Sequence, residues 1–247
     1  MMRAYGATHS GRRRDNNEDA FAILLERNAA LLADGMGGQN CGEVGSAITI
    51  QTVSEYLASP EVGLTREEIC KEAIRAANQN VIEAAKVRKE CDGMGSTVVM
   101  ALWDGAEMAI ANVGDSRAYL YRGGELRQLS YDQNFANELR TKLGFSEERV
   151  RNMPNRNVLT MAVGSFDHVL VRTHAQCLEP GDRVLLCSDG LYNPVEHDAI
   201  TQILEVSPSL ELAVQALVDS ANQNGGPDNV TAILLHYTNG SGEKGNG

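Results

Sequence analysis

Short apolar runs separated by polar or glycine-containing turns recur along the chain, and runs of this length predict β-strands. They lie at residues 21–25, 29–33, 96–103, 107–113, 116–121, 125–129, 182–187 and 229–237. Four other stretches have apolar residues three or four positions apart, the spacing of amphipathic helices. They lie at residues 44–57, 65–84, 195–204 and 210–223, and Thr65 with Glu68 predicts a capping box for the second.

The turns between the central strands are too short for a parallel connection, which needs a dozen or more residues. Residues 104–106, 114–115 and 123–124 are therefore read as hairpin turns of an antiparallel sheet. Helices before and after these strands give an α+β fold. We expect one domain over residues 1–238, a polar surface excursion at about 133–157, and a disordered glycine-rich tail at 239–247.

The composition argues against several classes of protein. The 247 residues carry a formal charge of −11 with a pI near 4.9, and so acidic a surface argues against nucleic-acid binding. No apolar stretch is long enough for a membrane anchor, and no apolar segment follows the basic N-terminus as in a signal peptide. The five cysteines form no C-x-x-C pair, so we expect small buried thiols in a cytoplasmic protein.

Three aspartates follow apolar strands and a fourth comes just before the closing strand, each next to a glycine or another small polar residue. They are Asp34, Asp115, Asp189 and Asp228. Each alone has the simpler interpretation of a turn residue. Four carboxylates brought together at strand ends would instead suit a hard cation such as Mg²⁺ or Mn²⁺.

Other chemistries lack their motifs. The loop at residues 34–38 has neither the glycine order of a dinucleotide-binding loop nor the Gly-Lys-Ser/Thr of a P-loop. No serine elbow or H-E-x-x-H zinc motif occurs, and the histidines are scattered. Taken alone, the polar segment at 14–19 is interpreted as a surface turn. If the segment lies beside a metal site, Arg14 would suit phosphate binding.

Six short motifs together resemble the metal-dependent type-2C protein serine/threonine phosphatases in their compact bacterial form. In chain order they are Arg14-x-x-Asn17-Glu18-Asp19, Asp34-Gly35-Met36-Gly37-Gly38, Gly95-Ser96-Thr97, Gly114-Asp115-Ser116-Arg117, Leu186-Cys187-Ser188-Asp189-Gly190-Leu191 and Asp228-Asn229-Val230-Thr231. Each motif is weak alone, but six in this order are a specific signal, and the resemblance runs from about residue 6 to residue 235.

The resemblance implies a four-layer α-β-β-α sandwich with a site for two Mn²⁺ or Mg²⁺ ions at one edge. It implies metal roles for Asp34 (bridging both ions), the Gly35 carbonyl, Asp189 and Asp228, with Glu18 and Asp19 acting through coordinated waters and Arg14 on the substrate phosphate. In bacterial relatives a third ion uses the positions of Asp115 and Asp189. The implied reaction is attack of a metal-bridging water on phosphoserine or phosphothreonine in proteins, without a phosphoenzyme intermediate.

The resemblance also identifies residues 133–157 as the family's flap, a segment beside the site that contributes to substrate choice. It implies phosphoprotein substrates, and it makes a cognate Ser/Thr kinase plausible; we expect a monomer. Three departures from the family pattern stand out. Met36 replaces the histidine of animal members, Asp132-Gln133-Asn134 replaces a common Asp-His-Ser, and Met161 replaces the arginine of Leu-Thr-Arg-Ala-Leu-Gly. Two alternatives stay open: a catalytically weak regulator that binds a phosphoprotein or kinase, and a hydrolase of small phosphate esters.

Overall fold

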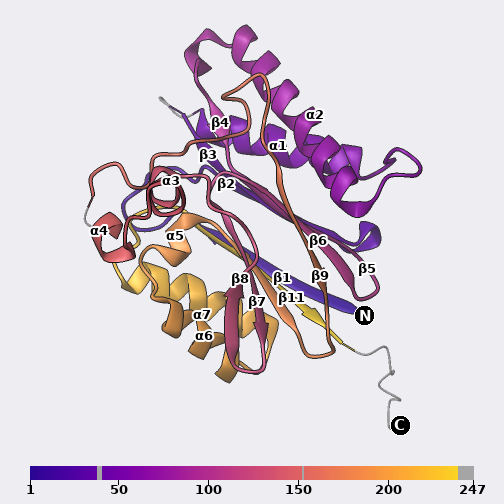
Figure 1. Ribbon diagram of the computed structural model, residues 1–247, viewed down its shortest axis with the longest axis vertical. Helices are drawn as coiled ribbons and strands as arrows, with labels where there is room; N and C mark the ends of the chain where they lie inside the picture. The colour runs from indigo at the N-terminus through magenta and orange to yellow at the C-terminus, as the bar shows by residue number, and fades with distance from the viewer. Residues whose placement is uncertain (38–40, 152, 239–247) are drawn as a thin grey trace.

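Two antiparallel sheets stack face to face in the computed structural model, which describes residues 1–37, 41–151 and 153–238 (Figure 1). The first sheet has the order β1 (Met2–His9), β11 (Val230–Tyr237), β10 (Arg183–Cys187), β7 (Arg117–Arg122) and β8 (Glu125–Gln128). The second has the order β2 (Asp19–Leu24), β3 (Ala29–Met36), β5 (Val98–Asp104), β6 (Glu107–Val113) and β9 (Arg172–Cys177), with β4 (Gly95–Ser96) paired to β3.

Helices cover the outer face of each sheet. The second sheet is covered by α1 (Gly42–Tyr56) and α2 (Arg66–Val87), and the first by α6 (His197–Val206) and α7 (Leu210–Gln223) (Figure 1). The shorter helices are α3 (Phe135–Leu143), α4 (Glu147–Arg151), α5 (Asp189–Tyr192) and the 3₁₀ turns η1 (Leu25–Arg27) and η2 (Lys89–Cys91). The α+β class and the four-layer sandwich are thus confirmed.

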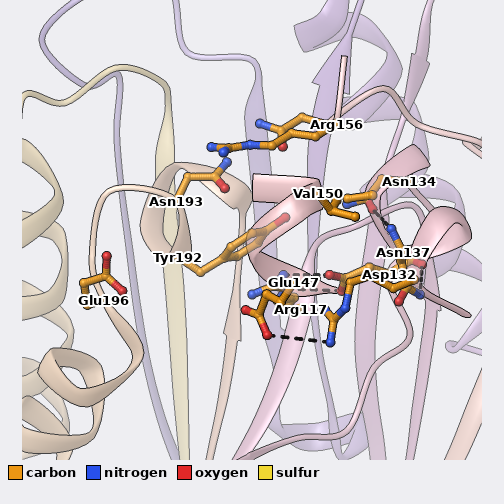
Figure 2. Close-up of a pocket in the computed structure, with 13 residues that line it drawn as sticks. Arg117, Asp132, Asn134, Asn137, Glu147, Val150, Arg156, Tyr192, Asn193 and Glu196 are labelled. Carbon is orange, nitrogen blue, oxygen red and sulfur yellow. Dashed lines mark hydrogen bonds and ion pairs between the residues drawn. The ribbon is translucent and has the colours of Figure 1, made fainter. Parts of the chain in front are cut away.

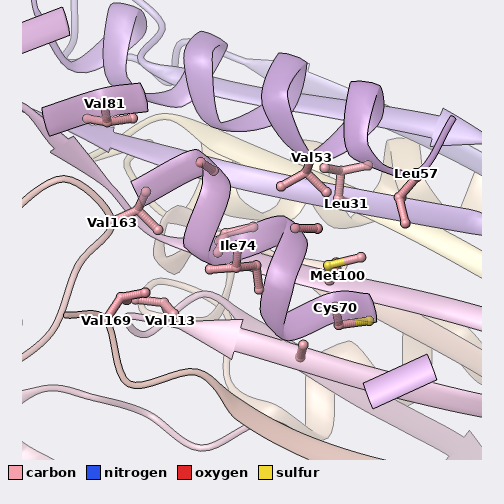
Figure 3. Close-up of a cluster of buried hydrophobic side chains, with 14 of the residues drawn as sticks. Leu31, Val53, Leu57, Cys70, Ile74, Val81, Met100, Val113, Val163 and Val169 are labelled. Atoms are coloured by element: carbon pink, nitrogen blue, oxygen red, sulfur yellow. The ribbon is translucent and has the colours of Figure 1, made fainter. Parts of the chain in front are cut away.

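Strand alternation divides the core into three layers. Along β3, Ala29 and Leu31 join the cluster under α1 and α2, while Ala30 and Leu32 join the cluster between the sheets. Figure 3 shows the outer cluster, in which Leu31 and Met100 of the sheet lie beneath helix residues such as Ile74. Buried on both faces, these strands are near-continuous apolar runs, which is why the sequence revealed them.

The sequence missed two strands, and both lie at sheet edges. β1 and β9 are the outermost strands of their sheets, and each carries many polar residues. The side chains of both strands are half-buried or exposed, so neither strand shows the apolar run that marks an interior strand. The interior strands and the long helices were predicted from the sequence. The capping box predicted at Thr65 and Glu68 is present, with the Glu68 amide donating to Thr65 Oγ1.

The hairpin turn predicted at residues 114–115 is wrong. β6 belongs to the second sheet and β7 to the first, so the chain crosses between the sheets at this point. Gly114 makes the crossing possible, since its φ is +90° and a Cβ there would lie 2.7 Å from Thr97 Cγ2. A short link forbids a parallel crossover within one sheet, but it does not require the two strands to pair.

The prediction of five free cysteines is also wrong. Cys41 and Cys91 form a disulfide that joins the start of α1 to η2, although 50 residues separate them in sequence. Cys70 and Cys187 are buried thiols as expected, and Cys177 is exposed. The expected tail at 239–247 lies outside the described residues. Within the described part of the chain, no helix combines the length and apolar character needed to cross a membrane.

Candidate metal centre

The predicted site residues gather around one cavity of about 460 Å³ at an edge of the sandwich. They come from ends of strands in both sheets and from the loops that follow. The predicted residues among those lining the cavity are Arg14, Glu18, Asp34, Gly35, Asp115, Asp189 and Asp228. Asp19 is the exception, because it lies buried beside Asp34 and does not line the cavity.

Asp34 is held rigidly at the end of β3. It pairs in register with Asp19 on β2, and its backbone amide donates to Thr97 Oγ1 at 3.0 Å. Burial, followed by the nearby charges of Asp19 and Asp189, raises the pKa of Asp34 well above its usual range. A carboxylate buried among like charges is stable in its ionised form only with a compensating positive charge.

Asp19 is only 8% exposed, and it has one satisfied and one unsatisfied carboxylate oxygen. Oδ2 accepts hydrogen bonds from Ser188 Oγ at 2.8 Å and Thr231 Oγ1 at 2.6 Å. Oδ1 is buried without a partner among the described residues. Burial raises the pKa of Asp19 to about 6. An orphaned buried carboxylate oxygen is an acceptor that a cation or its coordinated water would satisfy.

Asp189 is the first residue of α5, directly after β10. Burial, with Asp115 and Asp228 as the next largest causes, raises its pKa to about 8. Its Oδ2 accepts a hydrogen bond from Asn193 Nδ2 at 3.0 Å, one helical turn later.

Glu18 and Gly35 meet where the N-terminal segment passes β3. The Gly35 amide donates to the Glu18 carbonyl at 3.1 Å, and the Glu18 amide donates to Asn229 Oδ1 at 2.8 Å. A Cβ on Gly35 would lie 2.0 Å from the Gly42 carbonyl oxygen, so only glycine fits there. Burial and then Glu43 raise the pKa of Glu18.

Arg14 and Asp228 form the solvent-facing rim. Arg14 Nη2 donates to Asp228 Oδ2 at 2.8 Å, and the Arg14 side chain is 51% exposed. The charge of Asp228 raises the pKa of Arg14. Arg14, the predicted phosphate ligand, thus lies at the cavity, but it is paired with Asp228, a predicted metal ligand.

Asp115 approaches from the crossing between the sheets. Its Oδ2 accepts from Asn134 Nδ2 at 3.1 Å, and its backbone carbonyl accepts from Tyr192 Oη at 2.9 Å. Burial raises the pKa of Asp115 to about 6.

A second cavity of about 290 Å³ lies between the flap and α5 (Figure 2). Arg117 lies at its base, held by Asp132 through its Nε and Nη2 donors and stacked 3.6 Å from the ring centre of Tyr192. Asn157 lines both cavities, so the two are neighbours.

The donor set fits hard divalent cations. The cavity offers carboxylate and carbonyl oxygens, and among its described lining residues there is no histidine or cysteine. No three His, Cys, Asp or Glu side chains in the described ranges already close around a common point as a metal site does. The raised pKa values of Asp34 and Asp189, together with the orphaned Asp19 oxygen, indicate a cluster of acceptors short of positive charge.

The residues that hold these acids in place were not predicted from the sequence. They are Thr97, Asn134, Ser188, Tyr192, Asn193, Asn229 and Thr231. Most of them sit inside the six motifs or next to them. A polar side chain within or beside an apolar strand, as at Thr231, was a signal that could have identified several.

Comparisons with known proteins agree with this geometry. The family described as Protein phosphatase 2C matches residues 5–234. The serine/threonine phosphatase stp of Listeria welshimeri is 35% identical over 240 residues, covering 95% of each chain. The solved catalytic domain of the serine/threonine protein phosphatase PstP, in complex with two manganese ions, has a TM-score of 0.86 at 30% identity, covering 96% of this chain and 99% of that one. Serine/threonine phosphatase Stp1 from Staphylococcus aureus has a TM-score of 0.90 at 31% identity, covering 97% of this chain and 96% of that one.

Proposed function

Because the chain belongs to the protein phosphatase 2C family and is a metal-dependent protein phosphatase, we propose that its strand-end carboxylates hold Mn²⁺ or Mg²⁺ to hydrolyse phosphoserine and phosphothreonine in proteins. The observation that carries this proposal is the buried cluster around Asp34, with the partnerless Asp19 oxygen beside it.

We assign the direct metal contacts to Asp34, Asp189, Asp228 and the Gly35 carbonyl, with Asp115 at a third position. Glu18 and Asp19 hold coordinated waters in this assignment. Bound divalent cations supply Lewis acidity and lower the pKa of water to near neutrality. The lining supports water as the nucleophile. Its one hydroxyl among the described residues, Thr97 Oγ1, already bonds the Asp34 amide and Ser116 Oγ.

Arg14 binds the substrate phosphate in this proposal. A guanidinium has five N–H donors, and the contact with Asp228 uses one of them. The remaining donors can contact phosphoryl oxygens at the mouth of the cavity and neutralise charge that grows there during transfer. The flap cavity, which shares Asn157 with the lining of the site, would receive residues that flank the phosphorylated one.

The proposed substrate class also implies a partner enzyme and a cellular location. A phosphoprotein substrate must be made by phosphoryl transfer to serine or threonine, so we infer a Ser/Thr kinase acting on the same proteins, and a cytoplasmic location where ATP is available to it. We expect the protein to act as a monomer. Light scattering at working concentration checks the oligomeric state.

The substrate class is tested by phosphate release from matched phosphoserine, phosphothreonine and phosphotyrosine peptides and from p-nitrophenyl phosphate. We expect manganese-dependent release from the first two peptides, and loss of release with a chelator. Binding of phosphopeptide without turnover would favour the regulatory alternative. Turnover of p-nitrophenyl phosphate alone would favour a hydrolase of small phosphate esters.

A further inference from the structure

The segment that leads into the flap departs from the family pattern, and the structure gives the departure a role. Residues 132–134 read Asp-Gln-Asn and connect β8 to α3. Their side chains are polar and yet buried, with Gln133 3% and Asn134 6% exposed. Buried polar side chains need partners, so their hydrogen bonds show what this segment does.

Gln133 holds Gly114 from two directions. Its backbone amide donates to the Gly114 carbonyl at 3.0 Å, and its Oε1 accepts from the Gly114 amide at 2.8 Å. Its Nε2 donates to the Leu170 carbonyl at 2.8 Å. The residue before Asp115 is thereby fixed to the start of the flap.

Asn134 connects the flap helix to the site with a single side chain. Its Oδ1 accepts from the Asn137 amide at 3.0 Å and so caps the N-terminus of α3. Its Nδ2 donates to Asp115 Oδ2 at 3.1 Å. Figure 2 shows Asn134 beside Asn137 and Val150, on the flap wall of the second cavity.

The two bonds of Asn134 have linked consequences. A carboxylate is free to rotate about its terminal torsion, and a donor on one oxygen limits that freedom. The other oxygen of Asp115 is then presented in a restricted orientation. The same side chain sets where α3 begins, so movement of the flap and orientation of the Asp115 carboxylate are coupled.

We propose that Asn134 is a positioning residue that orients Asp115 for a third cation and couples occupancy of that position to docking of the flap. This inference rests on the proposed metal-dependent function. Coupling of this kind is reciprocal. The free energy by which the docked flap strengthens cation binding should equal that by which the cation stabilises docking of α3.

Two variants separate this role from simple helix capping. Asn134→Ser keeps an N-cap oxygen but removes the amide nitrogen that donates to Asp115. Asn134→Ala removes both bonds. Asn137→Ala is the matched control, since Asn137 Nδ2 anchors the same helix to the Asp132 carbonyl at 2.7 Å without touching Asp115.

The test measures Mn²⁺ binding to the metal-stripped proteins by calorimetry and exchange of backbone amides in α3 with and without Mn²⁺. We expect both Asn134 variants to weaken the weakest Mn²⁺ site by about tenfold, as loss of a group that orients a metal ligand does, while the tighter sites are unchanged. Mn²⁺ should slow exchange in α3 of the wild type and of Asn137→Ala, but not of Asn134→Ser.

Unchanged Mn²⁺ affinities in Asn134→Ser would overturn the inference. Equal weakening in Asn137→Ala would also overturn it, because the effect would then come from general loosening of the flap. Failure of the proposed function looks different: the wild type itself would show no manganese-dependent phosphate release.

Discussion

The strand-end side of the site and the flap side hold their acids by different means. On the strand-end side, Asp19 and Asp34 face each other on neighbouring strands and are bonded by groups from the core. On the flap side, Asp115 sits on a crossing between sheets and is held by Asn134 and Tyr192. The first arrangement is fixed by the sandwich, whereas the second depends on how the flap and α5 pack.

The largest expected effect is the loss of the acid at the centre of the strand-end side. Asp34→Asn keeps the shape of the side chain but removes its charge, so we expect kcat to fall by at least about 10³-fold. The fold should survive, since the change removes a buried charge with a raised pKa. Steady-state kinetics and circular dichroism check this. Asp104→Asn, at an exposed strand end far along the sheet, is the control for charge. Activity of Asp34→Asn near that of the wild type would refute the assignment.

Removing the rim cation should affect substrate binding instead. We expect Arg14→Ala to raise KM by about 10- to 100-fold, the range for loss of a charged hydrogen bond, with little change in Mn²⁺ affinity. Kinetics on one phosphothreonine peptide and a manganese titration measure the two effects separately. An unchanged KM would remove Arg14 from the phosphate role.

The disulfide reinforces the strand-end side and has no counterpart in the flap among the described residues. Cys41→Ser opens a link across 50 residues, so we expect the free energy of unfolding to fall by about 2–4 kcal/mol. Urea unfolding without reductant measures it, and Cys177→Ser, an exposed free thiol, is the control. A wild type whose stability is insensitive to reductant would contradict the pairing.

The stability of the metal-free protein should have an inverted pH dependence. Burial raises the pKa of Asp19 and Asp115 from 3.8 to about 6 and that of Asp189 to about 8. Between 3.8 and these values the folded state holds protons that the unfolded state has released, so stability falls as pH rises through this window. We expect a higher Tm at about pH 5.5 than at about pH 8 in chelator.

Manganese should reverse that trend, since it binds the ionised carboxylates and displaces their protons. Scanning calorimetry with and without Mn²⁺ at both pH values provides the comparison. A metal-free protein that is more stable at the higher pH would show that the cluster carries no excess of buried negative charge.

The same contrast explains what the sequence could predict. Asp34 and Asp189 follow apolar strands whose pattern is unmistakable, so their convergence could be inferred from the residues alone. The crossing at Asp115 was misread as a hairpin, because a short link does not reveal whether its two strands share a sheet. The role of Asn134 and the Cys41–Cys91 pairing could not be predicted, since both depend on how distant segments pack.

The central claim is that phosphate release depends on cations held by the strand-end aspartates. The most direct measurement is the rate of phosphate release from a phosphothreonine peptide as Mn²⁺ is added to metal-stripped wild type, Asp189→Asn and Asp104→Asn. We expect a saturating rise for wild type and Asp104→Asn, and a rate for Asp189→Asn that stays at background. Release by the wild type without added metal, or a wild-type response in Asp189→Asn, would contradict it.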